Sequence, residues 1–393
     1  MKWAKRELDH RNLGMSDQQA VELYRTMLLA RKMDDRMFAL NRQGRAPFVV
    51  GSSGHEAIQV ASVGPLDPER DWIMPYYRDM GVALAWGIPV LDIFLAVFAR
   101  KSDPMSGGRQ LPNHWSDVDR KVFTQSSTIG TQYPHAVGIA QGIALDGGDG
   151  VVVVYGGEGS TSEGDWHEAM NWAGIHRLPI IFIIENNGYA ISVPTGEEVA
   201  GRIYDRAKGY GIDGVLIDGN DPLGVYAAMT KAVEHARNGD GPTLIEAETY
   251  RYYAHTSDDD DKVYRSAEEV ELWRRKDPIL VLKQYMVESR LLDEATEARI
   301  EREVSNEIAL AVKEADGAPD AIDWESNVYA APIEDGAPAT EPEATPVGES
   351  VNMITAVNKT LHELLAEYED VVIFGEDVAD PKGGVFKATV GLT

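Results

Sequence analysis

Cysteine is absent from the 393 residues, which excludes disulfides, thiolate nucleophiles and cysteine metal sites. Basic residues are few, because 37 Lys and Arg stand against 64 Asp and Glu and leave a net charge of −27. A nucleic-acid-binding protein needs a basic face to displace counterions, so this balance argues against nucleic acid as a partner. The longest apolar run, around residues 88–99, is interrupted by Asp92 and is too short to span a bilayer. Residues 1–17 lack an apolar signal region, so we expect a cytoplasmic protein that does not enter a membrane.

The composition indicates a globular protein. Hydrophobic residues make up 44% of the chain, and its length suggests two or more domains. From about residue 120 to 250, short β-branched runs alternate with helix-like segments such as Asp165–Ile175. The runs predict four strands at Val151–Tyr155, Ile180–Ile184, Val215–Ile217 and Thr243–Ala247. This alternation predicts an α/β fold, with a mostly parallel sheet and helices on both faces.

Helix patterns flank this region. Residues 16–43 begin with the cap-like Ser16, have apolar residues at helical spacing and end before Gly44. Residues 266–315 predict two or three charged amphipathic helices. Residues 331–348 are rich in Ala, Pro and Glu without periodicity, which is typical of an extended linker. Residues 349–393 then predict one helix and a strand at Val371–Phe374, too little to bury a core alone, so we expect them to begin a further domain.

Two loops of the predicted sheet carry the chemistry. The first strand ends in "YGGEGSTSEGD" (155–165), where glycines surround Glu158, and the second ends in "ENNGYAIS" (185–192). If these strands are neighbours in a parallel sheet, both loops lie at its carboxyl edge, where open α/β sheets bind ligands. The glycines at 156, 157 and 159 would let backbone N–H groups approach an anion, with the positive end of the following helix pointing the same way.

An acidic residue inside that loop indicates a metal-bridged phosphate, because Glu158 would repel a phosphate unless a cation lay between them. The Asn187 side-chain oxygen and the Tyr189 main-chain carbonyl are hard ligands suited to octahedral Mg²⁺. The two loops together therefore predict a magnesium diphosphate site. Each motif alone is also typical of an ordinary tight turn. A second alternative is a dinucleotide-binding fold, with Gly157, Gly159 and Ser162 as an approximate fingerprint and Glu185 as the ribose-binding acid. That alternative leaves Glu158 and Asn187 without a role.

With these residues in view, the sequence resembles a known family. The glycine–acid–glycine turn, followed after residues 160–185 by Asn186 and Asn187, matches the thiamine diphosphate motif. From about residue 15 to 330 the chain resembles the alpha subunit of the decarboxylating component of 2-oxoacid dehydrogenase complexes. The strings "ENNGYAIS", "SSTIGTQYPHAVG" and "RYYAHTSDDDDKVYR" favour the branched-chain type. The tail, with "GEDVADPKGGVFKATVGL", resembles the start of the beta subunit.

The resemblance implies three parts: an alpha-type thiamine-diphosphate-binding domain (1–330), a linker (331–348) and the beginning of a fused beta-type pyrimidine-binding domain (349–393). It implies Mg²⁺ ligation by Glu158, Asn187 and Tyr189, in agreement with the reading of the loops. It implies cofactor contacts for Tyr77, Arg78, Ser127, Ile129, Gly157, Glu158, Gly159, Ser160, Asn187, Tyr189, Ile191 and His255. It also implies a possible K⁺ loop of Ser126, Thr128, Thr131 and Gln132. Tyr76 and Glu185 stand where mammalian-type members have Gln and Arg.

The implied activity is oxidative decarboxylation of branched-chain 2-oxoacids, with transfer of the acyl group to a lipoyl group on an acyltransferase partner. His255 and Ser127 are the implied catalytic residues, with His255 managing protons. The carboxylate that activates the cofactor belongs to the beta-type part, so we expect an alpha2beta2-like assembly and no turnover without a beta-type chain. Pyruvate or acetoin remain alternative substrates. The alternatives of another class are a nicotinamide-dependent dehydrogenase and a non-catalytic paralogue.

The acidic run Asp258–Asp261 next to His255 is, by default, a solvated surface. The resemblance implies instead a loop that becomes ordered when the cofactor binds. Proteolysis with and without the cofactor would distinguish the two.

Overall fold

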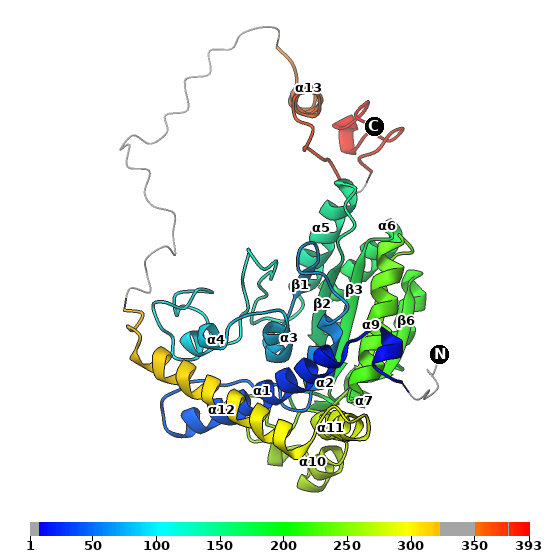
Figure 1. Cartoon of the computed structure of the whole chain (residues 1–393). Helices are drawn as coiled ribbons and strands as arrows, with labels where there is room; N and C mark the ends of the chain where they lie inside the picture. Colours follow the sequence, from blue (N-terminus) through cyan, green and yellow to red (C-terminus); the bar gives the residue numbers. More distant parts are fainter. Residues whose placement is uncertain (1–7, 323–349, 376) are drawn as a thin grey trace. The chain divides into compact units, whose positions relative to one another are not determined.

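A computed structural model describes residues 8–322, 350–375 and 377–393 (Figure 1). The chain divides into two compact units, Met1–Val328 and Tyr329–Thr393. In the first unit the helices are α1 (Asp17–Arg42), α2 (Glu56–Val63), α3 (Met80–Ala85), α4 (Val90–Val97), α5 (Gln132–Leu145), α6 (Gly164–His176), α7 (Thr195–Glu198), α8 (Ile203–Arg206), α9 (Pro222–Arg237), α10 (Ala267–Arg274), α11 (Pro278–Glu288) and α12 (Glu294–Gly317). Among the described residues, no helix is long and apolar enough to cross a membrane.

A five-stranded parallel sheet forms the centre of the first unit. Its strands follow the order β1 (Trp72–Met74), β2 (Val152–Gly157), β3 (Ile180–Asn186), β7 (Thr243–Glu248) and β6 (Asp213–Asp218). The four predicted strands are thereby confirmed, and β2 and β3 are parallel neighbours. The loops after β2 and β3 therefore lie at the same edge of the sheet, as predicted. A short hairpin of β4 (Tyr189–Ala190) and β5 (Val193–Pro194) follows β3.

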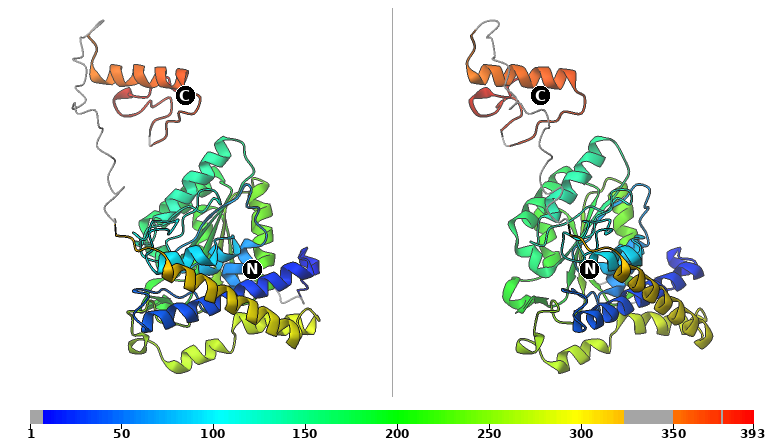
Figure 2. Two further views of the ribbon diagram at one scale, coloured as in Figure 1. Left: turned by 60° about the vertical axis from the view of Figure 1, so that its left-hand side comes forward. Right: turned by 90° about the vertical axis from the view of Figure 1, so that its left-hand side faces the viewer.

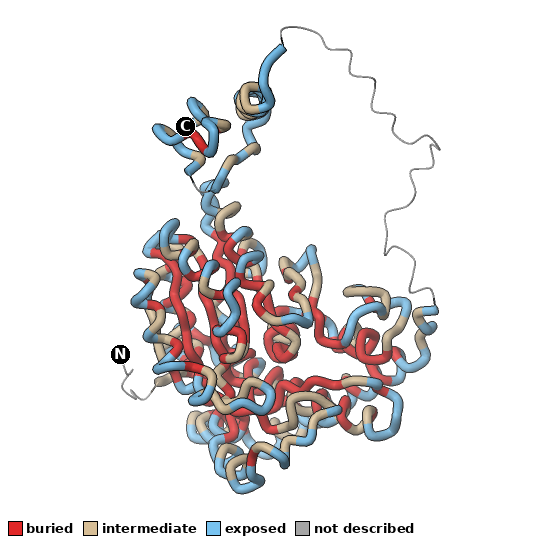
Figure 3. Tube along the Cα trace, turned by 180° about the vertical axis from the view of Figure 1, so that it is seen from behind, coloured by how far each residue is buried: buried red, intermediate tan, exposed pale blue. Residues whose placement is uncertain are grey.

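The sheet is buried on both faces, which explains the unbroken apolar runs at residues 151–154 and 180–184 in its central strands. Val151, Val153 and Tyr155 face one cluster of buried side chains, whereas Val152 and Val154 face the other. Seen as a tube coloured by burial, the strands form a buried layer between more exposed helices (Figure 3).

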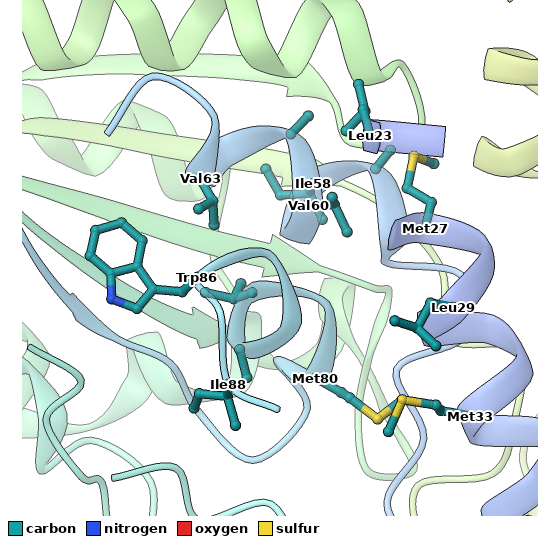
Figure 4. Packing of buried hydrophobic residues seen from close by; sticks show 14 of the residues in the cluster. Leu23, Met27, Leu29, Met33, Ile58, Val60, Val63, Met80, Trp86 and Ile88 are labelled. Carbon is teal, nitrogen blue, oxygen red and sulfur yellow. The ribbon is translucent and has the colours of Figure 1, made fainter. Parts of the chain in front are cut away.

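The larger of the two clusters lies where α1, α2 and α3 meet. Helix α1 begins at a capping box in which Ser16 and Gln19 bond each other's backbone N–H, and this confirms the predicted start. Met33 of α1 and Met80 of α3 point toward each other across this core (Figure 4). Helix α12 runs along α1, as the two views in Figure 2 show, and α10, α11 and α12 confirm the helices predicted over 266–315.

The second unit contains helix α13 (Met353–Glu367), which confirms the predicted helix. The strand predicted at Val371–Phe374 is wrong, because these residues have no regular secondary structure. A strand needs a hydrogen-bonded neighbour, and the described residues of this unit contain no other strand. The predicted linker, residues 331–348, lies outside the described residues.

Gly54 lies where the loop before α2 meets the segment after β7. Its φ is +101°, and a Cβ built there would lie 1.9 Å from the Tyr250 carbonyl oxygen. Gly44 also has a positive φ, +70°, but nothing lies within 4 Å of its Cβ position. We expect Gly44→Ala to cost about 1 kcal/mol and Gly54→Ala about 4 kcal/mol or more, because only the second adds a backbone clash to the strain. Thermal unfolding of the two variants checks this, and equal losses would contradict it.

Candidate functional site

A cavity of about 510 Å³ opens at the carboxyl edge of the sheet, between the loops that follow β2 and β3. Every residue that the sequence assigned to the cofactor lines it, although these residues come from segments far apart in the chain. They are Tyr77, Arg78, Ser127, Ile129, Gly157, Glu158, Gly159, Ser160, Asn187, Tyr189, Ile191 and His255. The fold therefore brings the predicted set together around one space.

The glycine loop after β2 is shaped as much by packing as by any ligand. A Cβ at Gly156 would lie 2.0 Å from the Tyr133 hydroxyl, and one at Gly159 would lie 2.9 Å from Ala190 Cβ. Gly157 lines the cavity, where a Cβ would meet only the Tyr76 hydroxyl at 3.9 Å. A 3₁₀ turn, Glu158–Ser162, comes between this loop and α6, and α6 confirms the helix predicted at Asp165–Ile175.

The three predicted metal ligands are linked to one another. The Asn187 backbone N–H donates to Glu158 Oε2 over 3.1 Å, and the Tyr189 backbone N–H donates to Asn187 Oδ1 over 3.3 Å. Arg251 Nη1 lies 3.4 Å from the Tyr189 carbonyl oxygen. Among the described residues, no cluster of three or more His, Cys, Asp or Glu could hold a metal. The predicted site of Glu158, Asn187 and the Tyr189 carbonyl is of a different kind, because only one of its three ligands is a carboxylate.

Glu158 is a buried acid with no ion pair among the described residues. Its side chain is only 1% exposed, and burial raises the pKa of its carboxyl group to about 7. A buried carboxylate is costly unless a positive charge offsets it. Glu56, another buried acid, has that partner already, since Arg31 Nε lies 2.5 Å from its Oε1. The residues around Glu158 therefore fit a bound divalent cation.

Two buried arginines make the cavity suitable for an anion. Arg78 and Arg251 both line it and are nearly fully buried, at 2% and 1% exposure. Burial, together with the charge of Arg78, lowers the pKa of Arg251. Buried guanidinium groups that repel each other are stabilised by a phosphate group, which each can bind through two N–H donors. The cavity thus combines a buried acid that fits a cation, Glu158, with two arginines that fit an anion, Arg78 and Arg251. A metal-bound diphosphate would use both.

His255 is held as a neutral ring. Burial and the charges of Arg78 and Arg251 lower its pKa to about 3. Arg78 Nη2 donates to His255 Nδ1 over 3.2 Å, so the ring proton lies on Nε2. The Asp259 carboxylate accepts from the His255 backbone N–H (2.8 Å) and from the Tyr264 hydroxyl (2.6 Å). The acidic run is therefore not a purely solvated surface, because Asp259 fixes the His255 backbone.

A buried polar cluster that includes Tyr76 and Glu185 lies behind the cavity. The Tyr76 hydroxyl and Gln59 Nε2 each donate to Glu185 Oε2 over 3.1 Å. Asp79 lies beside them and accepts from the Tyr76 backbone N–H over 2.7 Å. Burial raises the pKa of Glu185 to about 7 and also raises that of Asp79. Glu185 is thus enclosed by protein and cannot reach a ribose, which removes the main support for the dinucleotide alternative.

The four residues of the possible K⁺ loop are close in space, but their polar groups are engaged. The Ser126 hydroxyl donates to the Thr128 carbonyl over 2.5 Å and lies 2.8 Å from Thr131 Oγ1. The Gln132 amide accepts from Gly130 N–H (3.0 Å) and donates to the Tyr155 carbonyl (3.2 Å). A cation bound here would have to replace the Ser126 hydrogen bonds.

Several residues of the cavity are not among those predicted from the sequence. Arg251 begins the string that carries His255, so its position was a usable signal. No motif in the sequence indicates that His114, Glu198 or the apolar residues of the cavity wall belong to the site. Only the folded chain brings their segments to the cavity. The apolar wall consists of Phe48, Val50, Leu111 and Pro112, with the predicted Ile129 and Ile191.

A parallel α/β sheet with a cavity at its carboxyl edge, lined by a buried acid and two buried arginines, places this protein among the open α/β proteins that bind ligands at that edge. Residues 24–322 of this chain match the family described as the dehydrogenase E1 component. The 2-oxoisovalerate dehydrogenase subunit alpha of Bacillus subtilis is 50% identical over 311 residues, covering 79% of this chain and 94% of the relative. The pyruvate dehydrogenase E1 component subunit alpha of the same organism is 39% identical over 307 residues, covering 78% and 80%. The mitochondrial 2-oxoisovalerate dehydrogenase subunit alpha 2 of Arabidopsis thaliana is 37% identical over 322 residues, covering 81% and 68%.

The chain therefore belongs to the dehydrogenase E1 component family, whose members are 2-oxoacid dehydrogenase components that use thiamine diphosphate. The family match and the α/β fold confirm the resemblance to the alpha-type component, and the fused beta-type part stays a prediction.

Proposed function

We propose that this chain binds thiamine diphosphate through Mg²⁺ and takes part in the oxidative decarboxylation of branched-chain 2-oxoacids. The acyl group is transferred to a lipoyl group on an acyltransferase partner. The observation that carries the proposal is Glu158, a buried acid with no ion pair in the part of the chain that the structure describes, which accepts from the Asn187 backbone N–H and lines the same cavity as Arg78 and Arg251.

Thiamine diphosphate, when bound, supplies the carbanion and the electron sink for decarboxylation. The protein supplies binding, orientation and proton control. Glu158, Asn187 and the Tyr189 carbonyl would hold the metal, while Arg78 and Arg251 would offset the remaining negative charge of the diphosphate. His255 presents its Nε2–H as a donor, because Arg78 occupies the other ring nitrogen.

The apolar wall of the cavity supports a branched aliphatic substrate. Phe48, Val50, Leu111 and Ile129 offer surface that a branched side chain would cover, whereas the methyl group of pyruvate would leave much of it unfilled. Of the relatives compared here, the one at 50% identity is named for 2-oxoisovalerate and the one at 39% for pyruvate. A panel of 3-methyl-2-oxobutanoate, pyruvate and acetoin tests the preference, and a higher kcat/KM for pyruvate would contradict it.

The activity should require a beta-type partner, in an alpha2beta2-like assembly. We expect residues 1–393 alone to bind Mg²⁺ and thiamine diphosphate weakly and to give no measurable decarboxylation of 3-methyl-2-oxobutanoate. The reason is that the carboxylate which activates the cofactor belongs, by the family resemblance, to the beta-type part. Adding a beta-type chain should restore carbon dioxide release. Turnover by this chain alone would contradict the expectation.

Thermal shift distinguishes this function from the nicotinamide-dependent alternative. Thiamine diphosphate with Mg²⁺ should raise the unfolding temperature, and NAD should not. For a non-catalytic paralogue, Glu158→Ala would leave the function unchanged.

Binding of K⁺ at Ser126–Gln132 and a cytoplasmic location stay predictions. So does the assignment of residues 349–393 to a fused beta-type domain, because the family match ends at residue 322.

A further inference from the structure

The loop that carries His114 is anchored firmly on both sides of that residue. Asn113 has a φ of +67°, and its Nδ2 donates to the Val50 carbonyl over 3.1 Å. Trp115 is fully buried, and its indole N–H donates to the Tyr76 carbonyl over 2.9 Å. Val50 and Tyr76 themselves line the cavity, so His114 is fixed relative to its wall.

The hydrogen bonds of His114 determine which ring nitrogen carries the proton. Nδ1 lies 3.0 Å from the Leu111 carbonyl and 3.3 Å from the Pro112 carbonyl. A carbonyl oxygen only accepts, so Nδ1 carries the proton and the neutral ring has an acceptor at Nε2. The Ser127 Oγ lies 2.7 Å from Nε2. Ser127 is therefore the donor in this pair.

Both residues line the cavity, and Ser127 is one of the residues that the family resemblance places at the reacting centre. The His114 side chain is largely buried, whereas Ser127 is exposed to the cavity. A serine hydroxyl has one proton and two lone pairs. Once its proton is directed to His114, only the lone pairs remain for a bound ligand.

We propose that His114 is a positioning residue of the reaction: it accepts the hydroxyl proton of Ser127 and so presents the Ser127 oxygen to the cavity as a hydrogen-bond acceptor. The groups that this oxygen fits are hydrogen-bond donors, an amino or hydroxyl group of the bound reactants. The inference rests on the proposed function and adds to it a second histidine, on a different loop from His255 and with the opposite proton placement.

A double-mutant cycle tests the coupling in the assembly with a beta-type chain. We expect His114→Ala and Ser127→Ala each to lower kcat by about tenfold to 100-fold, because the acceptor is lost or misplaced. The double variant should lose no more than the worse single variant, since both remove the same interaction. Multiplied losses in the double variant would overturn the proposal.

Conservative variants of His114 separate positioning from simple packing. Gln can place its side-chain oxygen near the position of Nε2, whereas Asn is too short to reach it. We expect His114→Gln to regain most of the lost activity and His114→Asn to regain little. Equal activities of the two variants would contradict the proposed role of Nε2. His167→Ala is the matched control, because His167 bonds the Tyr210 hydroxyl away from the cavity, and it should leave kcat unchanged.

Nuclear magnetic resonance of the ¹⁵N-histidine-labelled full chain gives a readout that does not depend on turnover. The His114 ring should show the Nδ1–H tautomer without cofactor, and Ser127→Ala should shift its Nε2 resonance while leaving that of His167 in place. An Nε2–H tautomer, or an Nε2 resonance insensitive to Ser127→Ala, would overturn the proposal. If the wild-type chain turned over no 2-oxoacid even in the assembly with a beta-type chain, the proposed function would fail, while this resonance test would still decide the hydrogen bond.

Discussion

Glu158→Gln should abolish turnover, lowering kcat/KM at least about 1000-fold in the assembly with a beta-type chain. The amide removes the only negative charge among the three candidate metal ligands, and hard divalent cations depend on carboxylate oxygen. Stabilisation by Mg²⁺ with thiamine diphosphate should disappear with it. Steady-state kinetics and thermal shift both measure this. Retention of more than a tenth of the activity would contradict the role of Glu158 as the metal ligand.

The same substitution should stabilise the protein when no metal or cofactor is present. The pKa of Glu158 is raised from 4.5 to about 7, so its protonated form is favoured in the folded state. The wild type therefore loses stability relative to Glu158→Gln as the pH rises from about 4.5 to 7, by on the order of 3 kcal/mol, and the difference stays constant above that range. At pH 8 the variant should unfold at a higher temperature than the wild type. Below about pH 4.5 the two should be similar.

Glu56→Gln is the matched control for both measurements. Glu56 is equally buried, but Arg31 already offsets its charge. We expect this variant to be destabilised, because it leaves Arg31 with one partner fewer. Its response to Mg²⁺ and thiamine diphosphate should be that of the wild type. A loss of the metal response in Glu56→Gln would show that the effect at Glu158 is not specific to the site.

Arg78→Lys should weaken binding of thiamine diphosphate by about 100-fold, or roughly 3 kcal/mol, despite the retained charge. The Arg78 guanidinium donates to the Gly51 carbonyl over 2.6 Å and to His255 Nδ1 over 3.2 Å. A lysine ammonium is a single point and cannot hold both groups while also facing a phosphate. Titration calorimetry in the presence of Mg²⁺ measures the affinity.

Arg237→Lys serves as the comparison for Arg78→Lys. Arg237 Nη2 lies 2.5 Å from Asp71 Oδ2, and neither residue lines the cavity. Its replacement should lower thermal stability slightly and leave the affinity for the cofactor unchanged. If both lysine variants bound the cofactor like the wild type, the diphosphate would not be held by Arg78.

The central strands and their loops could be predicted because their signals are local. Strands β2 and β3 begin with unbroken apolar runs, at residues 152–154 and 180–184, since both faces of the sheet are covered. Their parallel pairing then fixes where Glu158 and Asn187 meet. Strand β1, in contrast, has only three residues, Trp72–Met74. Its place depends on pairing with β2 and on Asp71, which accepts the Val151 backbone N–H over 2.8 Å.

Parts of the site could not be predicted because they depend on tertiary contacts. His114 reaches the cavity only through the anchors of Asn113 and Trp115, and nothing in "PNHW" indicates them. Glu185 could be interpreted as a ribose-binding acid until Tyr76 and Gln59 were seen to enclose it. In the second unit, the apolar run Val371–Phe374 does not form a strand, because a strand also needs a hydrogen-bonded neighbour. The sequence predicts a ligand-binding role for the glycine loop, whereas Gly156 and Gly159 are also required by close packing.

The central claim is that one divalent cation lies between the loops that follow β2 and β3 and holds a diphosphate group. Crystals grown with thiamine diphosphate and Mn²⁺ in place of Mg²⁺ test it most directly, because the manganese position can be located by anomalous scattering. We expect a single strong peak within about 2.3 Å of Glu158, Asn187 and the Tyr189 carbonyl oxygen, with Arg78 on the diphosphate. A cavity that binds the cofactor without metal at Glu158, or a peak elsewhere on the protein, would contradict the claim.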